Sequence, residues 1–135
     1  MATLNEKQRE FLSNPFVGVV TTLRADGSPH STVVWVDESD SDTIEFNTAV
    51  GRAKERHLRE NPKVSLMIVD PQNPLRWVAV EGRAQLTDEG AEEQIDRLAK
   101  KYLGEDKYPW RNPAEERVRV RIRPERVEAT GLDGD

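Results

Sequence analysis

The chain has 135 residues, of which 25 are acidic and 20 basic, giving a net charge of −5, and this length suits one domain over residues 1–135. It has no cysteine and two histidines, His30 and His57, so disulfide scaffolds, thiolate nucleophiles and cysteine metal sites are excluded, and no metal site is expected. Hydrophobic residues make up only 36% of the chain, a low fraction for a self-contained core. We therefore expect a partner subunit or a bound ligand to complete the structure.

Several classes of partner and activity do not fit the sequence. No run approaches the roughly 18 apolar residues of a membrane span, and the first residues lack the apolar region of a signal peptide, so we expect a cytoplasmic protein that does not insert into membranes. The acidic balance, with aromatic residues that do not interleave with basic ones, disfavours nucleic acid as a partner. Ser28 and Ser31 lack the histidine and carboxylate order of a hydrolase, which disfavours acyl transfer.

The first predicted elements are a short helix and a β-hairpin. Thr3 and Glu6 have the spacing of a capping box and predict a helix that ends near Leu12. Residues 16–24 and 30–37 are rich in β-branched side chains and flank a turn-forming Ala-Asp-Gly-Ser-Pro segment. They therefore predict two antiparallel strands.

The middle of the chain adds strands around a second helix. Residues 43–47 predict a third strand, which would extend the hairpin into an antiparallel meander. Residues 52–61 (RAKERHLREN) predict a short helix, stopped where Asn meets Pro. A fourth strand is predicted at 64–69 and a long fifth strand at 75–86, with Gly82 as a bulge or kink of the kind that bends a barrel.

The last predicted elements are a helix and a strand. Residues 88–103 predict an amphipathic helix closed by Gly104, followed by a loop with the aromatic residues Tyr108 and Trp110. Its apolar face is formed by Ala91, Ile95, Leu98, Ala99 and Tyr102. Residues 116–123 predict a final strand in which apolar residues alternate with arginine. Six strands with short helices and no parallel crossover predict a mainly β fold, a small antiparallel barrel.

Basic residues gather where the second helix begins. The segment 52–63 has five basic and only two acidic residues within an acidic chain. Arg52 and Lys54 stand at the helix N-terminus, where free backbone N–H groups and the helix dipole favour an anion such as phosphate. The alternative is a solvated basic helix face whose charges pair at i,i+4 spacing.

A row of arginines would share one face of the last strand: Arg117, Arg119, Arg121 and Arg123. Because like charges in a row repel one another, acidic side chains from a neighbouring strand or subunit are expected opposite them. The alternative is a track for an acidic ligand tail.

The tryptophans and histidines have structural explanations. Trp35 and Trp77 fall within predicted strands, where packing on the barrel is the expected role and stacking on a cofactor is the alternative. His30 and His57 are expected at a strand edge and on a helix surface rather than as catalytic bases.

Five segments, taken in order, resemble one family. A strand pair, a threonine-bearing strand end, an Arg-x-Lys turn opening a helix closed by Glu-Asn-Pro, and the motif Arg-Trp-x-x-x-Glu-Gly-Arg-Ala occur within residues 19–29, 33–37, 46–62, 76–86 and 120–127. Together they are similar to the split-barrel flavin and deazaflavin family related to pyridoxamine 5′-phosphate oxidase, most of all to short members that use the deazaflavin coenzyme F420. The resemblance implies a six-stranded antiparallel split β-barrel and a homodimer with cofactors at the subunit interface.

The resemblance also implies a set of cofactor-binding residues: Thr32, Val33, Val34, Trp35, Asn47, Thr48, Ala49, Arg52, Lys54 and Trp77. The first four would run beside the cofactor ring, with main-chain groups bonded to its polar edge. The next five would hold the ribityl and phosphate groups. The last would reach the cofactor of the other subunit.

The function implied by the resemblance is an F420-dependent oxidoreductase that transfers a hydride between the reduced cofactor and an unsaturated small molecule. No catalytic side chain is assigned, although Tyr108 is a candidate proton donor. The surplus arginines Arg56, Arg59 and those of the last strand match the acidic tail of F420. FMN in the same site, giving an FMN-binding oxidoreductase or flavin reductase, is the nearest alternative. A protein of another class, which binds a flavin or haem-like ligand without catalysis, also fits.

Overall fold

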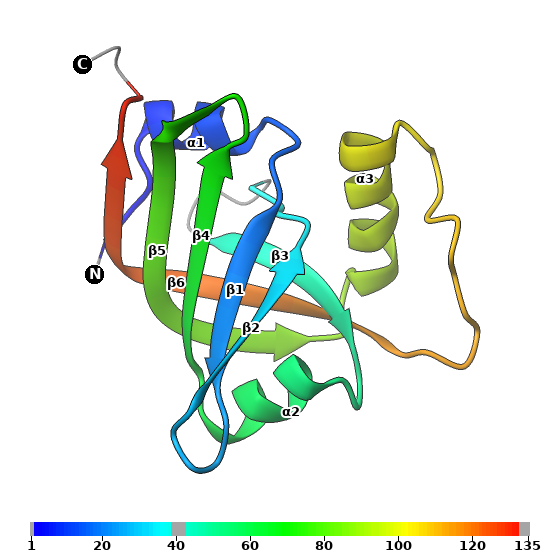
Figure 1. Cartoon of the computed structure of the whole chain (residues 1–135). Coiled ribbons are helices and arrows are strands. Elements are labelled where there is room, and N and C mark those ends of the chain that lie inside the picture. The colour runs from blue at the N-terminus through cyan, green and yellow to red at the C-terminus, as the bar shows by residue number, and fades with distance from the viewer. Residues whose placement is uncertain (1, 39–42, 133–135) are drawn as a thin grey trace.

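The computed structural model describes residues 2–38 and 43–132. Within these residues the chain forms three helices and six strands (Figure 1). In chain order they are α1 (Glu6–Leu12), β1 (Gly18–Leu23), β2 (Pro29–Val34), β3 (Ile44–Ala49), α2 (Ala53–Glu60), β4 (Lys63–Asp70), β5 (Asn73–Thr87), α3 (Ala91–Leu103) and β6 (Arg117–Thr130). The strands form one antiparallel sheet that curls into a half-barrel, so the predicted mainly β fold is confirmed.

The strand order of the sheet is β2-β1-β4-β5-β6-β3, which leaves β2 and β3 at its two edges. The predicted meander is therefore wrong after the hairpin, because β3 pairs with β6, from Ile44 opposite Ile122 to Ala49 opposite Arg117. Within the described residues, the two edges meet only at a bridge between Asp37, which follows β2, and Glu45 of β3. The N–H···O distances of this bridge are 2.8 and 2.9 Å. The half-barrel thus has a seam between β2 and β3.

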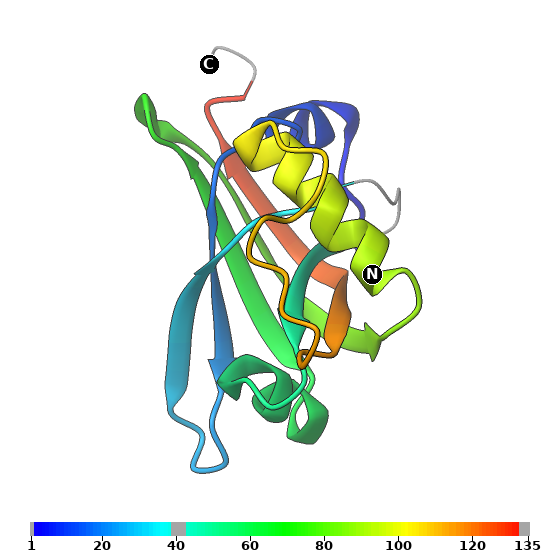
Figure 2. The same ribbon diagram turned by 90° about the vertical axis from the view of Figure 1, so that its right-hand side faces the viewer.

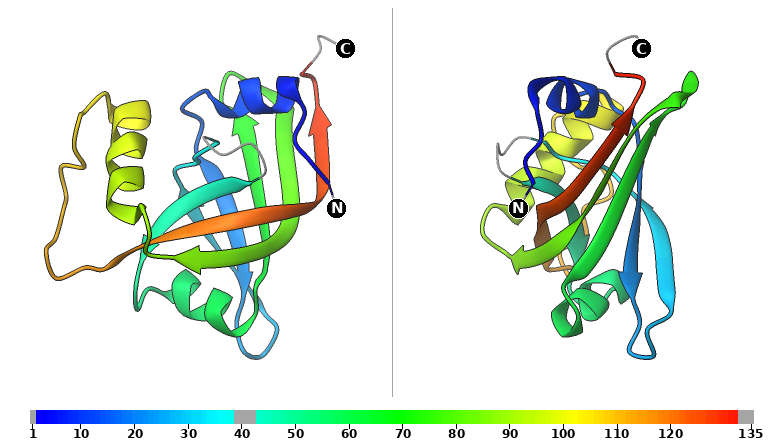
Figure 3. Two further views of the ribbon diagram at one scale, coloured as in Figure 1. Left: turned by 180° about the vertical axis from the view of Figure 1, so that it is seen from behind. Right: turned by 90° about the vertical axis from the view of Figure 1, so that its left-hand side faces the viewer.

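The sheet curls because β5 and β6 are long and bend (Figure 3). The register between them shifts at Gly82, as expected for a bulge. A Cβ atom at Gly82 would lie 2.1 Å from the carbonyl oxygen of Arg123, so only glycine permits this close approach. The last strand also runs further than predicted, because its second half continues beside β5 until Thr130 pairs with Trp77.

Helices α1 and α2 lie at opposite ends of the curled sheet (Figure 1). Phe11 and Leu12 of α1 are buried in the core. The capping box of α1 lies two residues later than predicted: Asn5 Oδ1 accepts from the N–H of Gln8 at 2.8 Å, and Gln8 Oε1 accepts from the N–H of Asn5 at 2.9 Å. The prediction of Thr3 and Glu6 as the cap is wrong, because the residue with the extended N-cap backbone is Asn5.

Helix α3 and the loop that follows it cover the side of the sheet where β2 and β3 lie (Figure 2). The predicted apolar face of α3 is confirmed: Ala91, Ile95, Leu98 and Ala99 are buried, and Tyr102 is half-buried. Gly104 ends the helix in the left-handed region at φ 76°, as predicted. In the part of the chain that the structure describes, no helix is long and apolar enough to cross a membrane.

Candidate functional site

A pocket of about 210 Å³ opens at the seam between the two edge strands. Its walls come from the end of β2, from β3, from the start of α2, from α3 and its loop, and from the first residue of β6. The lining residues are Val33, Val34, Trp35, Asn47, Arg52, Lys54, Ile95, Leu98, Tyr108, Trp110 and Arg117. Segments distant in sequence thus place cationic, apolar and aromatic side chains around one hollow.

The structure brings six of the predicted cofactor-binding residues together in this pocket: Val33, Val34, Trp35, Asn47, Arg52 and Lys54. Four others do not line it. Thr48 and Ala49 are buried, Thr32 is half-buried on β2, and Trp77 is half-buried on β5. The hydroxyl oxygens of Thr32 and Thr48 are buried and have no hydrogen-bond partner among the described residues.

Lys54 is one of the cations that line the pocket. It is half-buried, and among residues 2–38 and 43–132 no carboxylate pairs with it. Burial lowers the pKa of Lys54 below its ordinary value, and the neighbouring charge of Arg52 lowers it further. Because a desolvated ammonium without a counter-ion is costly, an anion bound in the pocket would satisfy it.

Two arginines of the pocket share one carboxylate. Arg52 Nη2 lies 2.6 Å from Glu115 Oε2, and Arg117 Nη2 lies 3.1 Å from Glu115 Oε1. The hydrogen bond from Arg52 is the main reason that the pKa of Glu115 lies below its ordinary value. Arg117 also donates from Nη1 to Asn47 Oδ1 at 3.3 Å. The sequence placed Arg117 only in the arginine row and gave no signal for Glu115. The spacing of charges within a strand does not show that Glu115, in the loop before β6, lies between Arg52 and Arg117.

An aromatic wall formed by Trp35, Tyr108 and Trp110 also lines the pocket, and the guanidinium of Arg117 lies over the Tyr108 ring, 5.0 Å from its centroid. Trp35 stacks on Tyr102 of α3, with ring centroids 5.4 Å apart and an interplanar angle of 9°, and meets Tyr108 edge-on. Trp110 in turn contacts Tyr108 edge-on at 5.7 Å. The N–H of Tyr108 donates to Asp96 Oδ1 at 2.9 Å, which ties this loop to α3. Trp35 follows the last residue of β2, so its predicted place within a strand is wrong.

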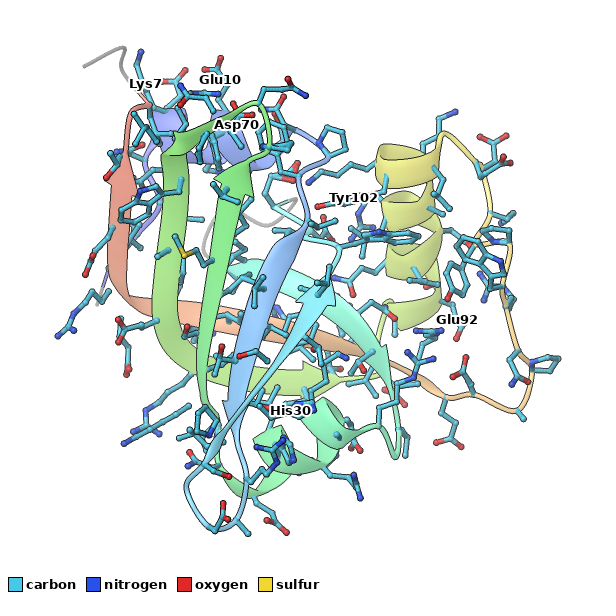
Figure 4. The ribbon with its side chains drawn as sticks, in the orientation of Figure 1. Lys7, Glu10, His30, Asp70, Glu92 and Tyr102 are labelled. Carbon is cyan, nitrogen blue, oxygen red and sulfur yellow. The ribbon has the colours of Figure 1, made fainter. Side chains whose placement is uncertain are left out.

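Tyr102 fixes α3 to the sheet beneath this wall (Figure 4). Its hydroxyl donates to the carbonyl oxygen of Phe16 at 2.7 Å and accepts from the N–H of Val36 at 2.9 Å. Burial raises the pKa of Tyr102 to about 12, so this phenol stays protonated at neutral pH. The stack on Trp35 therefore rests on an anchored ring.

Two arginines of the row pair with a buried acid of the neighbouring strand, as the first of its two explanations predicted. Glu45 of β3 is fully buried. Arg119 Nη2 lies 2.9 Å from Glu45 Oε1, and Arg121 Nε lies 3.3 Å from Glu45 Oε2. The other two arginines of the row have different partners: Arg117 pairs with Glu115, and Arg123 donates to Gln85. On α2, Arg59 pairs with Glu55 at i,i+4 spacing. These contacts leave the basic surplus of the pocket to Arg52, Lys54 and Arg117.

The two histidines lie together outside the pocket lining, His30 on the hairpin (Figure 4) and His57 on α2. His57 Nδ1 is 2.9 Å from Thr22 Oγ1, and the His30 and His57 rings pack edge to face at 5.1 Å. Both side chains are half-buried, so the expectation of a strand edge and a helix surface understates their packing.

Comparison with known proteins identifies the class. Residues 4–131 match the model of the pyridoxamine 5′-phosphate oxidase family. The chain therefore belongs to this family.

Similar proteins include curated relatives and solved structures. A pyridoxine/pyridoxamine 5′-phosphate oxidase from Photorhabdus laumondii is 34% identical over 83 residues, which are 61% of this chain and 37% of that protein, so the match spans little more than a third of the curated relative. A solved structure described as an F420 reductase superposes with a TM-score of 0.79 at 26% identity, covering 93% of this chain and 98% of that one. A conserved hypothetical protein from Mycobacterium tuberculosis gives a TM-score of 0.74 at 26% identity, covering 94% and 84%.

Proposed function

We propose that the chain is an oxidoreductase that holds a flavin-type cofactor in the pocket between β2 and β3, with coenzyme F420 as the first candidate and FMN as the alternative. The observation that carries the proposal is Lys54, a desolvated cation without a carboxylate partner among the described residues, facing the same pocket as Arg52. A phosphate group would satisfy both cations. The fold relationship to an F420 reductase over nearly the whole chain supports the deazaflavin.

The residues around the cations fit the rest of such a cofactor. Val33 and Val34 offer apolar surface from an edge strand. On its outer side this strand has no neighbouring strand among the described residues, so its main-chain N–H and C=O groups there suit the polar edge of a ring. The buried hydroxyls of Thr32 and Thr48 have no partner among the described residues, but neither residue lines the pocket, so we assign them no contact with the cofactor. A planar ring could be held between this strand and the aromatic wall.

A flavin or deazaflavin, when bound, supplies hydride transfer. The chain's own residues would bind the phosphate, orient the ring and exclude water. Tyr108 and Trp110 line the pocket from the loop after α3, where they would shield the ring and border an acceptor. The phenol oxygen of Tyr108 is the group we propose to hold a proton for the product.

The acidic tail of F420 has fewer candidate partners than the sequence suggested. Arg119 and Arg121 bind Glu45, and Arg59 binds Glu55. Arg56 is exposed on α2, and within the described residues no acid pairs with it. We therefore assign contact with an acidic tail to Arg56 rather than to the last strand.

We also propose that the protein works as a homodimer that completes this site. The outer face of the sheet carries an apolar row in which Val33, Val19 and Met67 lie opposite one another and are 63%, 44% and 43% exposed. Trp77 lies on the same face beside Val69. Because Val33 also lines the pocket, a second copy packed on this row would border the cofactor, and it would supply the apolar cover that the composition lacks.

A fluorescence titration tests the proposal. Purified protein is titrated with FMN and with F420 at two salt concentrations, and the Arg52→Ala/Lys54→Ala variant is compared with wild type. Losing two charged contacts should weaken either cofactor by roughly 100-fold and flatten the salt dependence. Arg83→Ala, which removes an exposed cation paired with Glu125 on the far strands, is the control and should change neither. Failure of both cofactors to bind the wild-type protein would refute the proposal.

Turnover separates the enzyme from the non-catalytic binding protein. The reduced holoprotein is mixed with a panel of quinones, enones and tetrapyrroles, and reoxidation of the cofactor is followed by absorbance. We expect reoxidation by at least one conjugated acceptor. Tight binding without any turnover would favour a protein that stores or sequesters its ligand.

A further inference from the structure

Glu115 places a carboxylate beside two arginines of the pocket. It binds Arg52 at 2.6 Å and Arg117 at 3.1 Å. Arg117 lines both the pocket and the neighbouring hollow, whereas Glu115 lines only the hollow. A ligand in the pocket would therefore meet Arg52 and Arg117 on one side while Glu115 stays on their other side.

This position partly offsets the attraction of the site for anions. The side chain of Glu115 is 24% exposed and that of Arg117 only 6%, so solvent screens this pair less than a surface pair. Arg52, at 47% exposed, is screened more. The charge of Glu115 repels any anion near Arg52, and by Coulomb's law the repulsion grows in proportion to the charge of that anion. Lys54, by contrast, has no carboxylate partner among the described residues.

We infer that Glu115 sets the charge selectivity of this site by disfavouring a doubly charged phosphate monoester more strongly than a singly charged phosphodiester. The inference rests on the proposed function, because it assumes that the phosphate of the cofactor lies beside Arg52 and Lys54. It makes Glu115 a specificity residue that acts through Arg52 without touching the ligand.

A purely structural role for Glu115 predicts the opposite change in ligand affinity when its charge is removed. If Glu115 only held Arg52 in place, removing its charge would release the guanidinium and weaken every phosphate-bearing ligand alike. The neighbouring residue provides a matched control. Glu116 carries the same charge one position later, is exposed, and makes no ion pair within the described residues.

The test uses three ligands that share one ring and differ only in the tail. Riboflavin or the corresponding deazariboflavin, whichever ring binds in the titration above, is compared with its 5′-phosphate and with the monomethyl ester of that phosphate. At pH 8 the monoester is a dianion, since its second pKa is about 6, and the methyl ester is a monoanion. Dissociation constants are measured by ring fluorescence for wild type, Glu115→Gln, Glu115→Asp and Glu116→Gln.

Glu115→Gln should tighten the monoester roughly tenfold and the methyl ester about threefold, because the repulsion removed is proportional to ligand charge. The ring without phosphate should bind as before. Glu115→Asp, which keeps the charge, and Glu116→Gln should both keep the wild-type ratio of monoester to diester affinity. If the glutamine variant does not fold, Glu115→Ala, which also removes the charge, replaces it, and an unchanged ratio of monoester to diester affinity there would overturn the inference.

Two further outcomes would overturn it and can be told apart. If Glu115→Gln weakens both phosphate ligands equally, or leaves their ratio unchanged, Glu115 positions Arg52 and does not select charge, while the proposed function stands. If wild-type protein binds neither ring in any of the three forms, the proposed function fails and the inference fails with it.

Discussion

Two clusters of charged side chains lie on either side of Asn47, and they differ in how completely their charges are paired. On one side Glu45, under α3, accepts hydrogen bonds from Thr43, Gln94 and Arg119. On the other side Arg52 and Arg117 share Glu115, and Lys54 lacks a carboxylate partner within the described residues. We call the first the closed cluster, because its carboxylate is fully paired. We call the second, formed by Arg52, Lys54, Glu115 and Arg117, the open cluster, because it has a surplus of positive charge.

Asn47 connects the clusters. Its Nδ2 donates to the carbonyl oxygen of Ala91 at 2.9 Å and to Gln94 Oε1 at 3.0 Å, while its Oδ1 accepts from Arg117. Gln94 donates onward to both Asp37 and Glu45. The closed cluster thus holds α3, and with it the aromatic wall, in place beside the open one.

The contrast separates structural charges from functional ones. A buried carboxylate with several donors stabilises a fold because removing it leaves its partners uncompensated. A desolvated cation without a partner destabilises the fold and is explained by what it binds. Removing Glu45 and removing the charge of Lys54 should therefore have opposite effects on stability.

Glu45→Ala should have the largest effect. It leaves Arg119 and Arg121 without their shared acid in a buried setting, so we expect the free energy of unfolding to fall by about 3–5 kcal/mol. Urea denaturation followed by circular dichroism measures the loss. Glu81→Ala, which removes the acid of an exposed pair with Arg126, should cost less than about 1 kcal/mol. Equal losses in the two variants would show that burial does not distinguish the clusters.

Lys54→Met should act in the opposite direction on stability. Burial and Arg52 disfavour the charged amine, so removing it should leave the unliganded protein unchanged or raise its stability by up to about 1 kcal/mol. Affinity for a phosphate-bearing cofactor should fall by about tenfold or more, because a charged hydrogen bond is lost. Thermal unfolding without ligand and fluorescence titration measure the two effects. A variant destabilised as strongly as Glu45→Ala would mean that Lys54 belongs to the closed cluster.

Local patterns in the sequence predicted most of the elements, and distant pairing accounts for most of the errors. Gly82 and Gly104 were correctly placed, because a bulge in a long strand and a helix end each have a nearby signal. The meander was wrong because β3 pairs with a strand that begins about 70 residues later, and alternation within β3 does not specify its neighbour. Alternation within β6 likewise did not show that the strand continues to Thr130.

In the candidate site, too, the sequence predicted the residues with a local signal and missed those that depend on distant contacts. Arg52 and Lys54 stood out as a local excess of charge, and the structure places both in the pocket. Glu115 carried no such signal, since its meaning depends on two arginines that the fold brings to it from different elements. The acid opposite the arginine row was expected, but only the sheet order identifies it as Glu45.

A pH titration should reveal a smaller effect on stability, which arises where α2 meets the hairpin. Helix α2, which begins just after Arg52, contacts the hairpin through His57, which bonds Thr22 and packs against His30. Burial lowers the pKa of His57 below its ordinary 6.5, and the charges of His30, Arg24 and Arg56 lower it further against an opposing effect of Glu60. The unfolded chain therefore takes up a proton at a higher pH than the folded one. Stability should fall as the pH drops through about 6.5 and level off below the folded pKa.

His57→Gln isolates this contribution, because other titrating groups remain in both proteins. At pH 8 the free energy of unfolding of the variant should be about 1 kcal/mol lower than that of wild type if the bond to Thr22 is lost. This difference should shrink as the pH falls, because only wild type has the imidazole whose lowered pKa destabilises the folded state in acid. The cofactor affinity of wild type should also fall as the pH falls, because protonation of His57 would loosen the helix that presents Lys54. The residues described around Glu45 include no histidine, so that cluster should hold α3 unchanged. A stability difference that stays constant from pH 8 to pH 5 would contradict the lowered pKa of His57 and remove the link between acidity and the pocket.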